Sequence, residues 1–163
     1  SLTSIMSTTG NRSLPSATRE AQVALAAPLK NKGQAPIEDV VEQSVNGWKA
    51  IRSPAFPQDD ELLRAQCDAV VRRGHHPAGV ARHLLACLCT TDRRAELQRL
   101  TLPTLVIHGT ADPLIPLACS EDTAANIPGS ELYTIEGMGH DLPDAVLPQL
   151  VEKISTLTRR MGQ

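Results

Sequence analysis

Residues 104–113 read TLVIHGTADP, an apolar run that reaches a glycine and then passes into a polar loop. Strands of a parallel sheet are covered on both faces, so they are apolar throughout instead of alternating. A helix is expected over residues 117–127, ended by Pro128 and Gly129, and a second strand over residues 131–135. This order of strand, helix and strand predicts a βαβ unit with two neighbouring parallel strands.

The two ends of the chain extend this unit. Residues 1–7 (SLTSIMS) favour a core strand, and the turn-forming residues 8–11 favour its exit loop. Near the other end, apolar residues recur at helical spacing from Val146 to Leu157, which predicts a final amphipathic helix starting near Leu147. The fold class predicted from these parts is α/β.

Residues 12–96 differ in character, because they are rich in alanine and charge and are interrupted by prolines and glycines such as Pro28 and Gly33. Asp59 or Asp60 is a candidate N-cap, and Gly74 a candidate helix stop. Four helices are expected in this region, over residues 37–45, 62–71, 78–88 and 93–99. The whole stretch is interpreted as a helical insertion.

Composition and charge limit the classes of function. The 163 residues are 41% apolar and 21% charged, which is typical of a folded chain, and the length favours one compact unit. A net charge of -2 and a pI near 6.2 give no electrostatic reason to expect nucleic acid or an anionic membrane as partner. No apolar stretch is long enough to span a bilayer. Cellular location stays open, with a cytoplasmic one favoured over secretion.

The four cysteines, Cys67, Cys87, Cys89 and Cys119, match no zinc or redox motif in their spacing. We interpret them as free buried thiols, in preference to a disulfide or a metal site. The adjacent His75 and His76 are interpreted as solvated turn residues instead of metal ligands. No metal and no cofactor is therefore expected.

Two polar loops follow the two strands of the predicted βαβ unit. The first carries Asp112 and the second His140, each at the carboxyl end of its strand, where open α/β sheets build their sites. An imidazole takes and returns a proton near neutral pH, and a carboxylate against its other nitrogen fixes the tautomer. Asp112 and His140 are therefore the candidate catalytic residues.

Plainer interpretations exist for each residue near these loops. Asp112 could serve only as a turn residue before Pro113, and His140 only as a loop or capping residue. His108, at the end of the strand, is expected to be packed and not catalytic. Asp141 and Asp144 are expected to favour the start of the last helix. Trp48 and Phe56 are candidates for a substrate pocket, although packing inside the fold is preferred for both.

The segments HGTADPLIP (108–116) and GMGHDLP (137–143) closely resemble the acid and histidine loops of the α/β-hydrolase superfamily. The resemblance implies the chain order nucleophile, acid, histidine, with the last two after strands seven and eight. Residues 1–11 would then be strand six with its exit loop, 12–96 a helical cap, and 97–163 the C-terminal core. The opening SLTSIMSTTGN also resembles the esterase branch that includes aclacinomycin methylesterase-like and haloperoxidase-like hydrolases.

No G-x-S-x-G elbow and no glycine-rich oxyanion loop occurs in the sequence, so both are expected upstream of Ser1. The resemblance then implies a serine esterase acting on a small ester-like molecule through an acyl-enzyme, with the 163 residues inactive by themselves. The first strand would have a free edge, which predicts pairing with the missing N-terminal half or self-association. Alternatives are a non-catalytic binding module and an aspartate nucleophile as in haloalkane-dehalogenase-like relatives.

Overall fold

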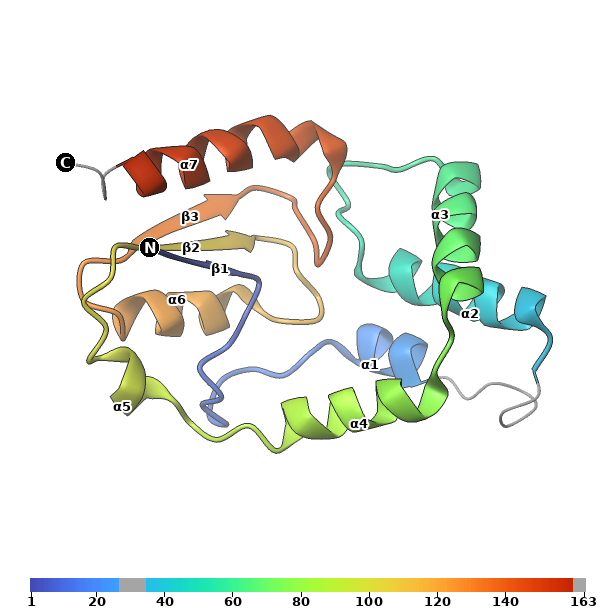
Figure 1. Ribbon diagram of the computed structural model, residues 1–163, viewed down its shortest axis with the longest axis horizontal. Helices are drawn as coiled ribbons and strands as arrows, with labels where there is room; N and C mark the ends of the chain where they lie inside the picture. Colours follow the sequence, from blue (N-terminus) through green and yellow to red (C-terminus); the bar gives the residue numbers. More distant parts are fainter. Residues whose placement is uncertain (27–34, 160–163) are drawn as a thin grey trace. The chain divides into compact units, whose positions relative to one another are not determined.

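The computed structural model describes residues 1–26 and 35–159, which form two compact units (Figure 1). Unit 1 comprises Ser1–Thr18, Ile51–Pro57 and the described residues from Thr91 onward. Unit 2 comprises the described parts of Arg19–Ala50 and Gln58–Thr90. The expectation of one compact unit is therefore wrong. The predicted roles of Pro28, Gly33 and the last four residues fall outside the described residues.

Unit 1 is built on a parallel sheet of three strands in the order β1-β2-β3. These are β1 (Leu2–Ile5), β2 (Thr104–Gly109) and β3 (Glu131–Ile135). The central strand β2 is buried along its whole length, as its apolar run predicts. In register, Ile107 lies beside Ile5 on one side and beside Tyr133 on the other. All three carboxyl ends consequently lie at one edge of the sheet.

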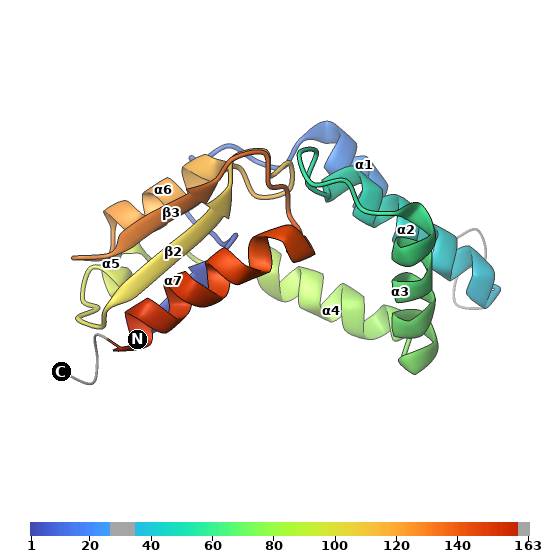
Figure 2. The same cartoon turned by 90° about the horizontal axis from the view of Figure 1, so that it is seen from above.

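Helices cover both faces of this sheet. Helix α6 (Leu117–Ala125) lies on one face and α7 (Leu147–Arg159) on the other, as Figure 1 and Figure 2 show. A 3-10 turn η1 (Asp144–Val146) leads into α7, and a short helix α5 (Arg94–Leu97) precedes β2. The apolar residues of α7 and the sheet form one core, made of Leu105, Ile107, Ile135, Met138, Val146, Leu150 and Leu157. The apolar face of the amphipathic helix α7 thus packs against the sheet.

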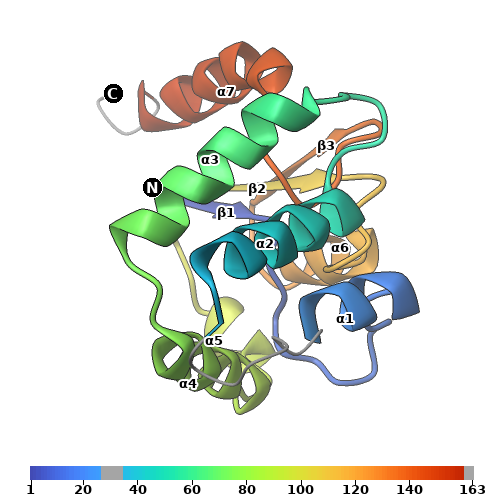
Figure 3. The ribbon, with the colours of Figure 1, turned by 90° about the vertical axis from the view of Figure 1, so that its right-hand side faces the viewer.

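Unit 2 contains α1 (Arg19–Ala26), α2 (Ile37–Ile51) up to Ala50, α3 (Asp60–Arg73) and α4 (Pro77–Leu88), which are labelled in Figure 3. Asp59 caps α3, since its Oδ1 accepts hydrogen bonds from the backbone N–H of Glu61 and Leu62 at 2.8 and 2.9 Å. The helix ends before Gly74, as predicted. The core of unit 2 lies between α2 and α3 and consists of Val40, Val41, Val45, Leu63, Cys67 and Val71.

Helix α4 buries none of its residues, although its sequence is apolar. Cys87 and Cys89 at its end are consequently exposed, so the expectation that all four thiols are buried is wrong for these two. Cys67 and Cys119 are buried, and burial raises the pKa of the Cys119 thiol. All four cysteines are free. Within residues 1–26 and 35–159, we find no helix of the length and apolarity needed to cross a membrane.

The boundaries of unit 2 differ from the predicted insertion at 12–96. Residues 12–18 and 91–96 belong to unit 1, and so does the segment Ile51–Pro57 between α2 and α3. Backbone hydrogen bonds between residues far apart in the sequence join these segments to unit 1. One example runs from Arg93 N–H to the Thr9 carbonyl at 2.9 Å. Composition does not reveal such bonds, because their partners lie far apart in the sequence.

Candidate active site

Two loops meet at the carboxyl edge of the sheet, one after β2 and one after β3. Hydrogen bonds join them directly: Thr110 N–H donates to the Ile135 carbonyl and Ala111 N–H to the Met138 carbonyl, each at 3.0 Å. The Thr110 hydroxyl also accepts from Gly137 N–H at 2.9 Å. Since adjacent parallel strands deliver both loops to the same edge, the site is assembled by the βαβ unit itself.

Glycines permit this close approach of the loops. A Cβ at Gly109 would lie 2.1 Å from the Met138 carbonyl oxygen, which is far inside van der Waals contact. Gly137 has φ +68°, a left-handed conformation that glycine adopts without strain. The sequence HG at the end of β2 therefore determines how closely the acid loop and the histidine loop pack.

Replacing Gly109 with alanine should destabilise the protein by about 3 kcal/mol, because the methyl group meets backbone that cannot rotate away. The matched control is Gly47→Ala within α2, where the added Cβ finds ordinary contact at 3.5 Å and alanine favours the helix. Urea denaturation followed by circular dichroism measures both. Equal stability of Gly109→Ala and the parent would contradict the close packing of the loops.

The structure brings the side chains of Asp112 and His140 into contact. Asp112 Oδ2 lies 2.7 Å from His140 Nδ1, and the carboxylate is fully buried. Its other oxygen, Oδ1, accepts from the backbone N–H of Leu114 and of Ile115, both at 2.9 Å. A buried carboxylate is costly unless hydrogen bonds satisfy it, and these three do so. The turn after Asp112 thus holds the acid in place for the histidine.

The pairing determines which nitrogen of His140 is available for chemistry. A carboxylate only accepts hydrogen bonds, so Nδ1 of His140 carries a proton, and in the neutral ring the lone pair is therefore on Nε2. The side chain is 24% exposed, in contrast to its buried acid partner. The pair can therefore accept a proton at Nε2 from a group that approaches from outside, and stabilise the resulting imidazolium.

His108 is packed inside the fold, as predicted. Its Nε2 donates to the Ile115 carbonyl at 2.7 Å, since a carbonyl can only accept, and its Nδ1 shares a 2.5 Å hydrogen bond with the Ser120 hydroxyl. The ring is fully buried and its Nε2 lies 3.4 Å from Asp112 Oδ2. His108 thus contacts the acid loop from inside the fold and is not exposed to solvent.

The segment Ile51–Pro57 also reaches the site, which the sequence did not predict. The Ile51 carbonyl accepts from His140 N–H at 2.7 Å, and the Ser53 hydroxyl accepts from Gly139 N–H at 2.8 Å. Asp141, expected to favour the start of the last helix, instead accepts from Ser53 N–H at 2.9 Å and from its hydroxyl. No local signal marks Ser53, because its partners lie more than 80 residues away.

The remaining candidates lie elsewhere. His75 and His76 are exposed, and the described part of the chain holds no cluster of three or more residues suited to a metal ion. Phe56 packs against the core of unit 1, in agreement with the interpretation preferred for it, whereas Trp48 on α2 is 43% exposed. Asp144 opens η1 and thus lies ahead of the last helix.

A comparison with protein families decides which kind of fold this site belongs to. The family described as serine aminopeptidase, S33, matches residues 18–144. The chain belongs to this family. The resemblance of its acid and histidine loops to those of α/β-hydrolases is thereby confirmed at the level of the superfamily. This S33-family chain contains the strands and flanking helices of part of an α/β-hydrolase fold.

Curated relatives of this S33-family chain include esterases and a lipase. Rhodomycin D methylesterase DnrP of Streptomyces peucetius is 34% identical over 75% of this chain and 41% of its own length. Monoacylglycerol lipase of Mycolicibacterium smegmatis is 33% identical over 54% of this chain and 32% of its own length. The chain therefore spans about two fifths of the length of the first of these relatives.

Solved structures show the same fold at lower identity. A meta-cleavage product hydrolase of Pseudomonas fluorescens has a TM-score of 0.66 at 14% identity and covers 98% of this chain and 55% of its own. An acetylester hydrolase of Corynebacterium glutamicum has a TM-score of 0.61 at 21% identity, covering 88% and 51%. The S33-family chain thus corresponds to about half of each of these folds.

Proposed function

We propose that this chain is part of a carboxylic ester hydrolase in which His140 is the general base and Asp112 its orienting acid. The observation that carries the proposal is the 2.7 Å contact between Asp112 Oδ2 and His140 Nδ1, formed by a buried carboxylate with two further backbone donors. This arrangement supports a base role because it leaves the lone pair of Nε2 directed away from the acid.

In the proposed reaction, Nε2 of His140 takes the proton of a serine hydroxyl while the serine oxygen bonds to the ester carbonyl carbon. Asp112 stabilises the imidazolium that forms. The imidazolium then returns the proton to the departing alkoxide, which leaves as an alcohol and an acyl-enzyme. A water molecule repeats these steps, so that the acid is released and the serine restored.

The nucleophile and the oxyanion donors are proposed to come from outside the 163 residues. The sequence contains no G-x-S-x-G motif, and the chain spans 41% of the first curated relative, in agreement with a nucleophile elsewhere. Methyl esters are the substrate class we propose. Two kinds of relative support it, since they are named rhodomycin D methylesterase and pimeloyl-[acyl-carrier protein] methyl ester esterase.

The test compares two proteins: the 163-residue chain by itself, and an extended protein in which the segment carrying the nucleophile precedes this chain. The extended protein should release methanol from a carboxylic methyl ester and should be labelled by a fluorophosphonate at a serine outside these residues. The chain by itself should do neither, because it lacks the groups that form and stabilise the intermediate. Labelling within the 163 residues, or a covalent ester on an aspartate, would contradict the proposal.

We further propose that the free edge of β1 pairs with a strand from that same preceding segment. In the described residues β1 pairs with β2 alone, and its four residues are only partly buried. An unpaired edge of this kind exposes a row of N–H and C=O groups that other strands can bind. The chain spans only part of the length of its relatives, and this supports the rest of the α/β-hydrolase fold as the source of the strand that pairs with β1.

The same two proteins, the 163-residue chain and the extended protein, test whether the β1 edge pairs with a preceding strand. By itself, the 163-residue chain should form dimers or larger species that grow with concentration, since its β1 edge is uncovered. The extended protein should be monodisperse, with the edge paired internally. Size-exclusion chromatography with light scattering measures both. A folded, monodisperse monomer of the 163-residue chain would contradict the proposed pairing.

A further inference from the structure

Three successive residues of the histidine loop are bound by one short segment of the chain. Gly139 N–H donates to the Ser53 hydroxyl, His140 N–H to the Ile51 carbonyl, and Asp141 accepts from Ser53. A further bond, from Ala55 N–H to the Gly137 carbonyl at 3.2 Å, continues the contact. The backbone on both sides of His140 is therefore held by residues 51–55.

We propose that Ser53 is a positioning residue for His140, an inference that rests on the proposed function of that histidine. The Ser53 hydroxyl accepts from the residue before His140 and donates to the carboxylate of the residue after it. A single hydroxyl thus joins the two neighbours of the base. Asp112 orients the ring at Nδ1, and Ser53 fixes the backbone that carries it.

Burial makes this contact hard to replace. Ser53 is 1% exposed, so water cannot easily substitute for its hydroxyl. A Cβ at Gly139 would lie 2.6 Å from the Ile51 carbonyl oxygen, which shows how closely the two backbones approach. Without the hydroxyl, the N–H of Gly139 and one oxygen of Asp141 each lose a partner in a confined space. We expect the histidine loop to relax by shifting His140.

The test measures kcat and KM for ester hydrolysis in the extended protein, normalised to the fraction of folded protein. Ser53→Ala should lower kcat by about tenfold to a hundredfold, because a shift of about 1 Å in a catalytic group has effects of that size. KM should stay within about twofold, since Ser53 is buried and contacts the loop instead of substrate. The low-field NMR signal of the His140 Nδ1 proton should shift or broaden.

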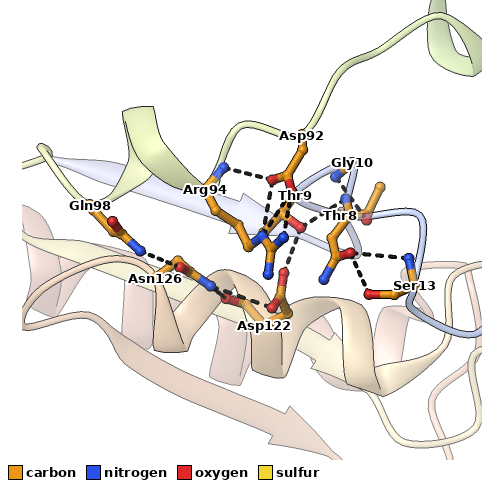
Figure 4. A network of polar contacts seen from close by, with 10 residues as sticks. Thr8, Thr9, Gly10, Ser13, Asp92, Arg94, Gln98, Asp122 and Asn126 are labelled. Carbon is orange, nitrogen blue, oxygen red and sulfur yellow. Dashed lines mark hydrogen bonds and ion pairs between the residues drawn. The ribbon is translucent and has the colours of Figure 1, made fainter.

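The matched control is Thr9→Val. Thr9 is fully buried and its hydroxyl donates to the carboxylate of Asp122 at 2.6 Å, within the network in Figure 4. This resembles the bond between Ser53 and Asp141, but it lies away from the histidine loop and contacts neither Asp112 nor His140. Thr9→Val should cost stability while leaving kcat and the His140 signal unchanged.

A second pair of variants covers the case in which Ser53→Ala does not fold. Asp141→Asn keeps an oxygen that accepts from Ser53, and should retain kcat within about threefold, whereas Asp141→Ala should lower it as Ser53→Ala does. Equal kcat in Asp141→Asn and Asp141→Ala, or an unchanged His140 signal in Ser53→Ala, would overturn the positioning role. If His140→Ala itself retains activity, the proposed function fails instead, so the two failures are distinguishable.

Discussion

Replacing His140 by alanine in the extended protein should lower kcat for a carboxylic ester by about 10⁵-fold to 10⁶-fold. The reason is that His140 is the proposed base, and His108, the histidine that also contacts the Asp112 loop, is buried with its Nε2 bonded to the Ile115 carbonyl. KM should change little, because a base that acts only in the transition state contributes little to substrate binding. Stopped-flow or steady-state measurement with a p-nitrophenyl ester gives both constants.

Two variants control for this loss. His75→Ala removes an exposed imidazole that lies before α4, and should leave kcat unchanged. Circular dichroism of His140→Ala should match the parent, since the His140 side chain is 24% exposed and the apolar core beneath the loop is left intact. A His140→Ala protein that keeps its kcat would remove this residue from the mechanism and with it the proposed function.

Replacing Asp112 by asparagine should lower kcat by about 10⁴-fold with little loss of structure. The amide oxygen of asparagine can still accept from Leu114 N–H and Ile115 N–H, so the turn is preserved. Its NH₂ group then faces His140 and donates to Nδ1. The proton moves to Nε2, and the ring can no longer accept the serine proton there.

The matched control for this change is Asp144→Asn, because Asp144 is an exposed carboxylate at the start of η1. It should keep kcat within about twofold, since exposed charges of this kind contribute little. Nitrogen-15 NMR of the two imidazole nitrogens of His140 gives the tautomer in each variant. Retention of the Nδ1 proton in Asp112→Asn, or an unchanged kcat, would contradict the role assigned to the carboxylate.

Much of unit 1 follows from local pattern. The apolar run of β2 and the amphipathic repeat of α7 each predicted their element, because burial on one or both faces dictates the spacing of apolar residues. Helix-breaking residues are a second local signal, because Pro128 and Gly129 follow the end of α6. Helix α1, in contrast, carries no strong pattern and was not predicted.

Sequence alone indicated that Asp112 and His140 come together, since adjacent parallel strands deliver successive loops to one edge of a sheet. Only the tertiary structure decided that Ser53 lies against the histidine loop, that residues 51–57 belong to unit 1, and that α4 buries nothing. These facts depend on contacts between residues far apart in the chain. Periodicity reports which face of an element is buried, whereas it carries no information about which distant segment covers that face.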